Sequence, residues 1–378
     1  MSDPVRAPSL EAQGMTKIFG PLVALGDVSI KVDAGSFHAL LGENGAGKST
    51  LVKCIMGFYS PDKGRVLLDG KEVAIKSPRD ARAHGIGMVY QQFTLVPSLT
   101  AAENLVISRA DAPGVIDWSK EKKALSAFMD QMPFRVPLDT QVSGLSAGEK
   151  QKLEILKLLY LDQRFMILDE PTSVLTPGEA DEMLGHLGAM AARKEITVLM
   201  ISHKFREVKA FCDHFTVLRR GQFTGEGDAK LVSVGEMSGM MIGDTTIRER
   251  ASRKADNARG DVLELAGLFA DDNDGMLAIK SLNLKIQGGE IVGIAGVSGN
   301  GQSALVETLS GQRPLSDGGI FIHGQRFEPK RGHFDRFKVF GLPEEPLKNA
   351  TVPKMSVAEN LAFRDFDRPP VATLGWWM

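Results

Sequence analysis

The glycine-rich stretch at residues 42–49 constrains this chain more than any other, because Gly-Glu-Asn-Gly-Ala-Gly-Lys-Ser fits the pattern G-x-x-x-x-G-K-[ST]. An apolar run at residues 37–41 precedes it, and a helix-like segment at residues 48–56 follows it. A strand, a glycine-rich loop and a helix in this order direct successive backbone N–H groups and the positive end of the helix at one polyphosphate. Lys48 would reach the β- and γ-phosphates, and the Ser49 hydroxyl would bind Mg²⁺.

Length, charge, cysteine content and apolar runs limit which kinds of protein this chain can be. A chain of 378 residues is too long for one ordinary domain, so two or three are expected. The formal charge of -2 gives no overall basic field, so nucleic acid is not expected as a partner. Cys54 and Cys212 form no metal or disulfide pattern, which favours a reducing compartment. No apolar run approaches a membrane span, so any role at a membrane is expected to operate from the cytoplasm through a partner.

An internal repeat sets the expected domain organisation. The apolar and glycine pattern of residues 24–70 recurs at a constant offset in residues 278–324, and residues 96–105 return as residues 352–361. We therefore expect a first domain at residues 8–245 and a second copy at residues 261–378. The charged stretch between them, residues 246–260, is expected to be an exposed linker. A basic patch for lipid or nucleic acid is the alternative, but acidic residues interrupt this stretch and no aromatic residues interleave with it.

The first copy has the pattern of an α/β domain. Helical stretches separate most of the short apolar strands that we expect at residues 65–68, 88–90, 165–168, 197–201 and 215–218. Residues 99–161 contain no comparable strand. They are expected to form a helical subdomain, helical throughout, inserted into the α/β core.

Two polar motifs of the first copy are candidate functional sites. Residues 165–168 lead into Asp169 and Glu170, where a parallel sheet presents its ligand site, so Asp169 would hold magnesium and Glu170 would polarise the attacking water. Ser146 and Glu149 have the spacing of a capping box at the start of a helix-like run. The second motif is either a helix cap alone or a helix N-terminus that binds a γ-phosphate across a dimer interface.

Three single residues are weaker candidates. His203 ends another apolar strand, although a solitary histidine is usually structural. Gln91 follows the expected strand at residues 88–90 and could complete the shell of the metal or of water. Phe19 precedes the phosphate loop and could stack on a base, although packing in the core is the default role of such a ring.

The order of these motifs resembles that of ATP-binding-cassette ATPases over residues 10–243. In that family an aromatic residue, the phosphate loop, a Gln, a Leu-Ser-Gly-Gly-Gln signature, an Asp-Glu strand and a His follow one another. The resemblance implies a P-loop NTPase-type α/β fold, duplicated in this chain, that uses ATP and Mg²⁺. It assigns ATP binding to Phe19, Gly42, Glu43, Asn44, Gly45, Ala46, Gly47, Lys48, Ser49 and Thr50, the signature to Leu145, Ser146, Ala147, Gly148 and Glu149, metal ligation to Ser49, Gln91 and Asp169, and catalysis to Glu170, His203 and Gln91.

Some residues depart from the family pattern. Ala147 and Glu149 replace the signature Gly and Gln but leave the expected phosphate contacts, Ser146 and Gly148, in place. Thr176 stands where the family usually has Asp, and this departure puts the coupling between the two nucleotide sites in doubt. Two cassettes in one chain resemble the sugar and nucleoside importers of bacteria. Leu-Ser-x-Gly-Glu, Leu-Thr-Pro and the second loop, Gly-Val-x-Gly-Asn-Gly-Gln-Ser at residues 296–303, favour the nucleoside branch.

The second copy lacks several of these groups. Gln302 occupies the position of Lys48, Pro343 and Glu344 fall near the expected Gln, and the chain ends at Met378 before a second signature, Asp-Glu strand or His. In the family, each ATP lies between the phosphate loop of one cassette and the signature of another. The first loop is therefore expected to need a signature from elsewhere, and two copies of the chain could pair as a homodimer to supply it.

The resemblance implies a peripheral ATPase subunit on the cytoplasmic face of the inner membrane. Its partners would be membrane permease subunits and, through them, an extracytoplasmic solute-binding protein. Two rivals remain open: a soluble cassette ATPase that does not transport, and a relic that binds ATP without turnover. The sequence does not identify the solute, because its pocket would belong to other subunits.

Overall fold

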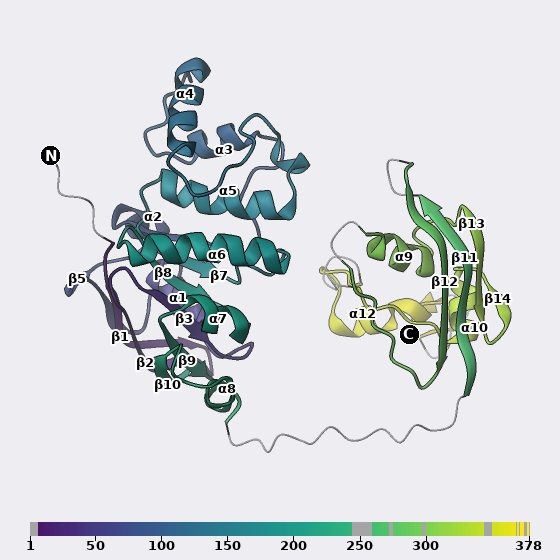
Figure 1. Ribbon diagram of the computed structural model, residues 1–378. Helices are drawn as coiled ribbons and strands as arrows, with labels where there is room; N and C mark the ends of the chain where they lie inside the picture. Colours follow the sequence, from purple (N-terminus) through teal and green to yellow (C-terminus); the bar gives the residue numbers. More distant parts are fainter. Residues whose placement is uncertain are drawn as a thin grey trace. The chain divides into compact units, whose positions relative to one another are not determined.

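The computed structural model describes residues 7–243, 259–271, 275–296, 300–343, 350–367, 369, 371–373 and 376–377. The chain divides into two compact units, Met1–Arg248 and Glu249–Met378 (Figure 1). Of the linker expected at residues 246–260, residues 246–258 lie outside the described part. Arg259 and Gly260 already belong to a strand. No helix in the described ranges has the length and apolar character needed to span a bilayer.

The main sheet of the first unit contains six strands. They are β3 (Phe37–Leu41), β6 (Ile86–Val89), β7 (Phe165–Asp169), β8 (Thr197–Ile201), β9 (His214–Arg219) and β10 (Gln222–Asp228). Their spatial order is β10-β9-β3-β8-β7-β6, and all but β10 run parallel. Since parallel strands bring their carboxyl ends to one edge, the segments after β3, β6, β7 and β8 lie at the same edge.

Both faces of this sheet are covered. In β3, Ala39 and Leu41 belong to one buried cluster and Leu40 to the other, because alternate side chains of a strand point to opposite faces. Helix α6 (Pro177–Ala192) packs in the first cluster and helix α1 (Lys48–Ile55) in the second. The first unit also contains α2 (Pro78–Ala83), α7 (Phe205–Phe211) and α8 (Val234–Ile242).

A second, antiparallel sheet packs with α1 in the second cluster. It consists of β1 (Leu10–Phe19), β2 (Leu22–Val32), β4 (Lys63–Leu68) and β5 (Lys71–Val73), in the order β2-β1-β4-β5. The strand expected at residues 65–68 is confirmed as part of β4, which pairs in antiparallel fashion with β1 and β5 and with no strand of the main sheet.

The subdomain at residues 99–161 is helical only in part. It contains α3 (Ala101–Ile107), α4 (Trp118–Met129), a 3-10 turn η1 (Val142–Gly144) and α5 (Ala147–Tyr160). The expectation of helix throughout was therefore wrong for residues 108–117 and for most of residues 130–146. Pro113, Pro133 and Pro137 lie in these segments, and proline cannot donate the backbone hydrogen bond that a helix interior requires.

The second unit repeats the antiparallel part of the first. Its described strands and helices are β11 (Arg259–Asp271), β12 (Leu277–Gly288), α9 (Gln302–Leu309), β13 (Asp317–Ile322), β14 (Gln325–Phe327), α10 (Arg331–Phe337), α12 (Val357–Ala362), η2 (Phe363–Asp365), β15 (Ala372–Thr373) and β16 (Trp376–Trp377). The order β12-β11-β13-β14 matches β2-β1-β4-β5. Residues 291–296, which correspond to β3, form no strand, and Ile291 is 81% exposed.

Candidate nucleotide site

The phosphate loop between β3 and α1 has a backbone that only glycine fits at two positions. Gly47, the N-cap of α1, has φ 100°, and a Cβ added there would lie 2.8 Å from the Ala24 carbonyl oxygen. Gly42 has φ 149°, and an added Cβ would collide with the Leu218 carbonyl. Both glycines let the loop lie against neighbouring strands. Ala46 N donates to the Glu43 carbonyl at 3.1 Å within the loop, and the N-terminus of α1 favours an anion.

Lys48 is held within this loop. Its Nζ donates to the carbonyl oxygens of Gly42 at 2.7 Å and Glu43 at 3.0 Å, and the residue is only 9% exposed. Burial lowers the pKa of Lys48, while Glu170 and Asp169 act in the opposite direction. The ammonium is thus partly desolvated beside two carboxylates, an environment in which its charge acts strongly on a phosphate.

Asp169 and Glu170 lie where β7 ends. Burial is the main reason that the pKa of Asp169 is raised, and the neighbouring Glu170 raises it further, whereas Lys48 lowers it. Glu170 adopts φ 49°, a left-handed conformation that is unfavourable for a non-glycine residue. Its backbone N–H donates to the Ile201 carbonyl at 2.9 Å, which ties the turn after β7 to the end of β8.

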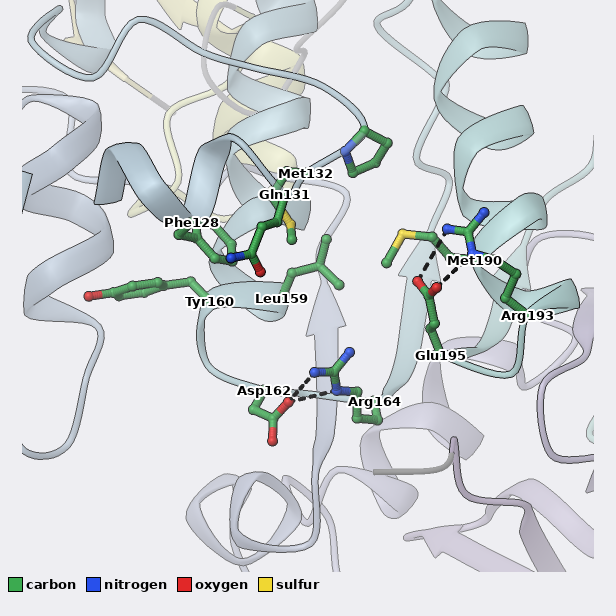
Figure 2. Close-up of a pocket in the computed structure, with 11 residues that line it drawn as sticks. Phe128, Gln131, Met132, Leu159, Tyr160, Asp162, Arg164, Met190, Arg193 and Glu195 are labelled. Atoms are coloured by element: carbon green, nitrogen blue, oxygen red, sulfur yellow. Dashed lines mark hydrogen bonds and ion pairs between the residues drawn. The ribbon is translucent and has the colours of Figure 1, made fainter. Parts of the chain in front are cut away.

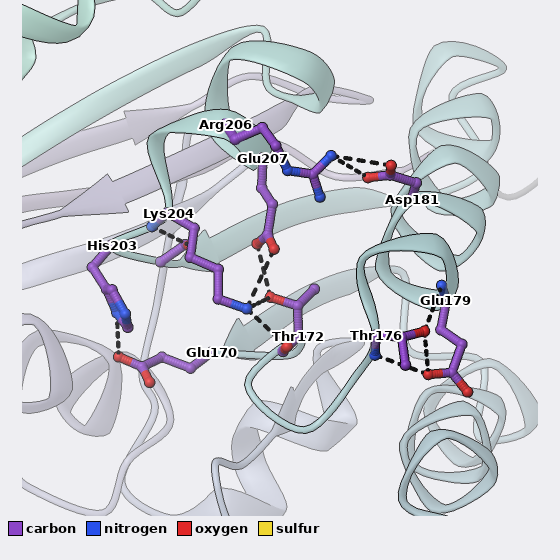
Figure 3. A network of polar contacts seen from close by, with 10 residues as sticks. Glu170, Thr172, Thr176, Glu179, Asp181, His203, Lys204, Arg206 and Glu207 are labelled. Atoms are coloured by element: carbon purple, nitrogen blue, oxygen red, sulfur yellow. Dashed lines mark hydrogen bonds and ion pairs between the residues drawn. The ribbon is translucent and has the colours of Figure 1, made fainter. Parts of the chain in front are cut away.

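His203 lies next to Glu170. Its Nδ1 is 3.1 Å from Glu170 Oε1, and Figure 3 shows the imidazole and carboxylate facing each other across the two loops. His203 follows β8 and Glu170 follows β7, and these strands are neighbours in the sheet. The structure therefore brings two of the residues expected to be catalytic into direct contact.

Two of the predicted metal ligands face solvent. Ser49, in the first turn of α1, and Gln91, after β6, are exposed. A hydroxyl, one carboxylate and a side-chain amide are oxygen ligands of the kind that Mg²⁺ takes together with substrate phosphates and water. No group of three His, Cys, Asp or Glu side chains suited to a metal occurs in the described part of the chain. Ser49, Gln91 and Asp169 have the donor atoms that Mg²⁺ bound together with a nucleotide would require.

The default role of Phe19 would be packing in the core, but the structure does not place it there. It ends β1, is 40% exposed and makes an edge contact with Tyr59 at 5.3 Å between ring centroids. Lys17 Nζ lies 5.4 Å from the same centroid. A partly exposed ring whose edge is fixed by a second ring offers a face on which a base can stack. Sequence reasoning missed Tyr59, which has no motif of its own.

The signature residues lie on the helical subdomain. Ser146 caps α5 and forms the predicted capping box: Glu149 N donates to Ser146 Oγ at 3.2 Å, and Ser146 N donates to Glu149 Oε2 at 2.8 Å. A Cβ added to Gly148 would lie 2.7 Å from Glu179 Oε1, so α5 and α6 approach closely there. No hydrogen bond or ion pair among the described residues joins residues 145–149 to residues 42–50.

Comparison with known proteins places this geometry in a family. The sequence profile described as "ABC transporter" matches residues 25–173 and 279–375. The nucleoside import ATP-binding protein NupA of Lactococcus lactis subsp. cremoris is 35% identical over 96% of this chain and 72% of its own length.

The chain belongs to the ABC transporter ATPase family.

Other relatives of this ABC ATPase agree. The guanosine import ATP-binding protein NupO of Bacillus subtilis is 32% identical over 97% of this chain and 72% of its own length. The ribose import ATP-binding protein RbsA 1 of Rubrobacter xylanophilus is 36% identical over 96% and 71%. Among solved structures, the ADP conformation of the ATP-binding cassette MJ1267 has a TM-score of 0.55 and 28% identity, and it covers 63% of this chain and 99% of that one. The predicted family and P-loop fold are thereby confirmed.

The second loop of this ABC ATPase has similar backbone geometry but different chemistry. Gly301 caps α9 with φ 88°, and an added Cβ would lie 2.6 Å from the Ala278 carbonyl oxygen, as Gly47 does against Ala24. Gln302 stands in the place of Lys48, and its amide occupies the space beside Gly296. Residues 297–299 of this loop and Glu344 lie outside the described residues.

A pocket lies at the other end of the main sheet. It has a volume of about 530 Å³ between the C-terminal ends of α4, α5 and α6 and the start of β7. Figure 2 shows Arg164 paired with Asp162 and Arg193 paired with Glu195 around it. None of its lining residues is one that the sequence assigned to ATP, so this pocket is separate from the nucleotide site.

Proposed function

We propose that this chain is the ATP-binding and hydrolysing subunit of an importer for nucleosides or simple sugars, with nucleosides favoured. The observation that carries the catalytic part is the convergence of Lys48, Asp169, Glu170 and His203 at the carboxyl edge of one parallel sheet. Import is supported by the names of relatives that match nearly the whole chain. The nucleoside preference rests on the motifs at residues 145–149, 175–177 and 296–303.

The residues divide the work on ATP. The loop N–H groups and Lys48 bind the phosphates, and Phe19 stacks on the base. Glu170 orients and polarises the attacking water, and His203, in contact with Glu170, senses the γ-phosphate. Ser49, Gln91 and Asp169 would hold Mg²⁺, which supplies positive charge against the phosphates when bound. Fixing these groups before the reaction reduces the reorganisation that the transition state demands.

The signature fits a role toward a second nucleotide loop. Ser146 is exposed at the N-terminus of α5, and a helix N-terminus favours a phosphate. We propose that residues 145–149 complete a site on another cassette, and that ATP binding closes and hydrolysis opens the pair. The motion would pass to membrane permease subunits that receive solute from an extracytoplasmic binding protein, with this chain peripheral on the cytoplasmic face.

Reconstituted transport tests the proposal. The membrane proteins that co-purify with the chain are placed in vesicles with a solute-binding protein, and uptake of labelled guanosine, ribose and glucose is measured with wild type and with Lys48→Ala. We expect ATP-dependent uptake of guanosine above that of the sugars, and no uptake with Lys48→Ala. Turnover without any membrane partner or uptake would indicate a non-transport ATPase. ATP binding without turnover in the assembled complex would indicate a relic.

A further inference from the structure

A buried threonine follows closely after Glu170, one of the two residues in contact at the nucleotide site. Thr172 is two residues after Glu170 and only 2% exposed. Lys204, the residue after His203, donates from Nζ to the Thr172 carbonyl oxygen at 2.8 Å and to its Oγ1 at 3.0 Å. Thr172 Oγ1 in turn donates to Glu207 Oε2 at 2.8 Å. Figure 3 shows these three side chains directed at one another beside the Glu170–His203 pair.

This Thr172–Lys204–Glu207 cluster is fully hydrogen-bonded. The Thr172 hydroxyl accepts from the ammonium and donates to the carboxylate, and Lys204 Nζ also lies 3.4 Å from Glu207 Oε1. Glu207 is 2% exposed, and a carboxylate buried to that extent is strongly unfavourable unless it is paired and hydrogen-bonded. Both charged residues lie at the start of α7, three positions apart. The cluster therefore fixes the loop after β7 to the segment after β8.

The cluster lies beside a turn whose backbone conformation is unfavourable. Glu170 has φ 49°, which a non-glycine residue keeps only when its surroundings enforce it. The Glu170 N–H is bound to Ile201, and the Glu170 carbonyl accepts from Ser173 N at 3.2 Å. Thr172 lies inside this turn. Without its hydroxyl, the turn would lose its hydrogen bond to Glu207 and the bond from Lys204 Nζ to Oγ1, and it would keep the bond from Lys204 Nζ to the Thr172 carbonyl.

We propose that Thr172, Lys204 and Glu207 are positioning residues for ATP hydrolysis, which hold the Glu170 carboxylate and the His203 imidazole at their mutual distance of 3.1 Å. Their role would be exerted through Glu170 and His203 rather than by direct contact with the nucleotide. The inference rests on the proposed roles of Glu170 and His203. It adds that the geometry of this pair is set by the ion pair of Lys204 with the buried Glu207 carboxylate and by the Thr172 hydroxyl, rather than by the two side chains alone.

Thr172→Val is the decisive change, because valine has nearly the shape of threonine but no hydroxyl. Thr172→Ser keeps the hydroxyl and is the conservative counterpart. Arg206→Ala is the matched control, since Arg206 lies on the same helix and forms an exposed ion pair with Asp181 at 2.8 Å that does not reach Thr172 (Figure 3). Phosphate release at saturating MgATP gives kcat, calorimetry gives the MgATP affinity, and hydrogen exchange is followed in peptides covering residues 168–176 and 202–208.

We expect Thr172→Val to lower kcat roughly tenfold to a hundredfold, the loss typical of a small misplacement of reacting groups, while MgATP affinity stays unchanged. Exchange should become faster in both peptides and stay unchanged around residues 42–50. Thr172→Ser should retain turnover, and Arg206→Ala should match wild type in turnover and exchange.

Several outcomes would overturn the inference. Unchanged kcat in Thr172→Val, with turnover lost in Glu170→Gln, would show that Glu170 acts without the cluster. An equal fall in kcat and MgATP affinity would mean a general structural role. Wild-type turnover in Glu170→Gln would instead refute the proposed role of Glu170. If turnover of the full chain is too slow to compare, unchanged exchange at residues 202–208 in Thr172→Val refutes the inference by itself.

Discussion

Acid should destabilise the first unit through His38, a buried histidine on β3, the strand that leads into the phosphate loop. His38 is 4% exposed, its Nε2 lies 2.8 Å from Thr216 Oγ1, and its pKa is lowered from 6.5 to about 4. Burial is the largest cause. The facing charged groups are His214, which lowers the pKa further, and Asp33, which raises it.

The free energy of unfolding falls in acid because the unfolded chain binds a proton that the folded chain does not. Between pH 6.5 and about 4 the unfolded chain binds a proton at His38 that the folded chain does not, so the free energy of unfolding falls as pH falls through this window. With these two pKa values the loss at pH 5 relative to neutral pH is about 2 kcal/mol. That is a large fraction of the stability of an ordinary domain.

The assay is urea unfolding of the full chain at pH 7.5 and pH 5, for wild type and for His38→Gln, whose neutral amide can still bond to Thr216. Trp118, packed partly against the core of the first unit, reports on that unit once Trp376 and Trp377 are replaced by Phe. We expect the pH-dependent loss to be smaller in His38→Gln by about 2 kcal/mol. His84→Gln, which alters an exposed histidine that is not among the groups acting on His38, is the control. The same pH dependence in wild type and His38→Gln would refute the reasoning.

Three further predictions concern the nucleotide site and its surroundings. Lys48→Ala should abolish tight MgATP binding, whereas Gln302→Lys should change it much less; equal affinities of wild type and Lys48→Ala in calorimetry would contradict this. Ser146→Arg should leave MgATP binding intact but remove any turnover that rises more steeply than linearly with protein concentration, because such turnover requires pairing; undiminished activity would show that the α5 N-terminus is not used. Glu154→Ala should lower the free energy of unfolding by about 3 kcal/mol, because Glu154 is 1% exposed and pairs with Lys157 at 2.6 Å. Urea unfolding measures this loss, and a loss smaller than that of Glu182→Ala, which alters an exposed residue, would argue against the prediction.

Strands and loops that carry their own local pattern could be predicted. The apolar runs before the phosphate loop, Asp169 and His203 became β3, β7 and β8 almost residue for residue, because central parallel strands are buried on both faces and read as continuous apolar stretches. The antiparallel sheet was harder to predict. In β1, bulges near Gly14 shift the pairing with β2, and they disturb the alternation by which such a strand is recognised.

Contacts between distant residues had no signal in the sequence. Thr172 and Glu207 are separated by 35 positions, and so their contact exists only because β7 and β8 are neighbours. Glu154 likewise accepts from Thr94 Oγ1 at 2.9 Å, which ties the segment after Gln91 to α5. Glu207 and Glu154 are charged residues on helices, and a sequence pattern assigns such residues to the solvent-facing side. Only the tertiary structure shows that it is buried.

The two loops separate the requirements of the fold from those of the chemistry. Gly47 and Gly301 have similar φ angles and crowd equivalent carbonyls, those of Ala24 and Ala278, so the close approach of loop and strand is kept in both units. The next residue is not under that constraint, and there the first loop has Lys48 and the second has Gln302. A repeat detected from glycines therefore shows that a backbone has been copied. Whether a phosphate meets a positive charge there depends on one side chain, so the function of each unit has to be argued from that side chain rather than from the repeat.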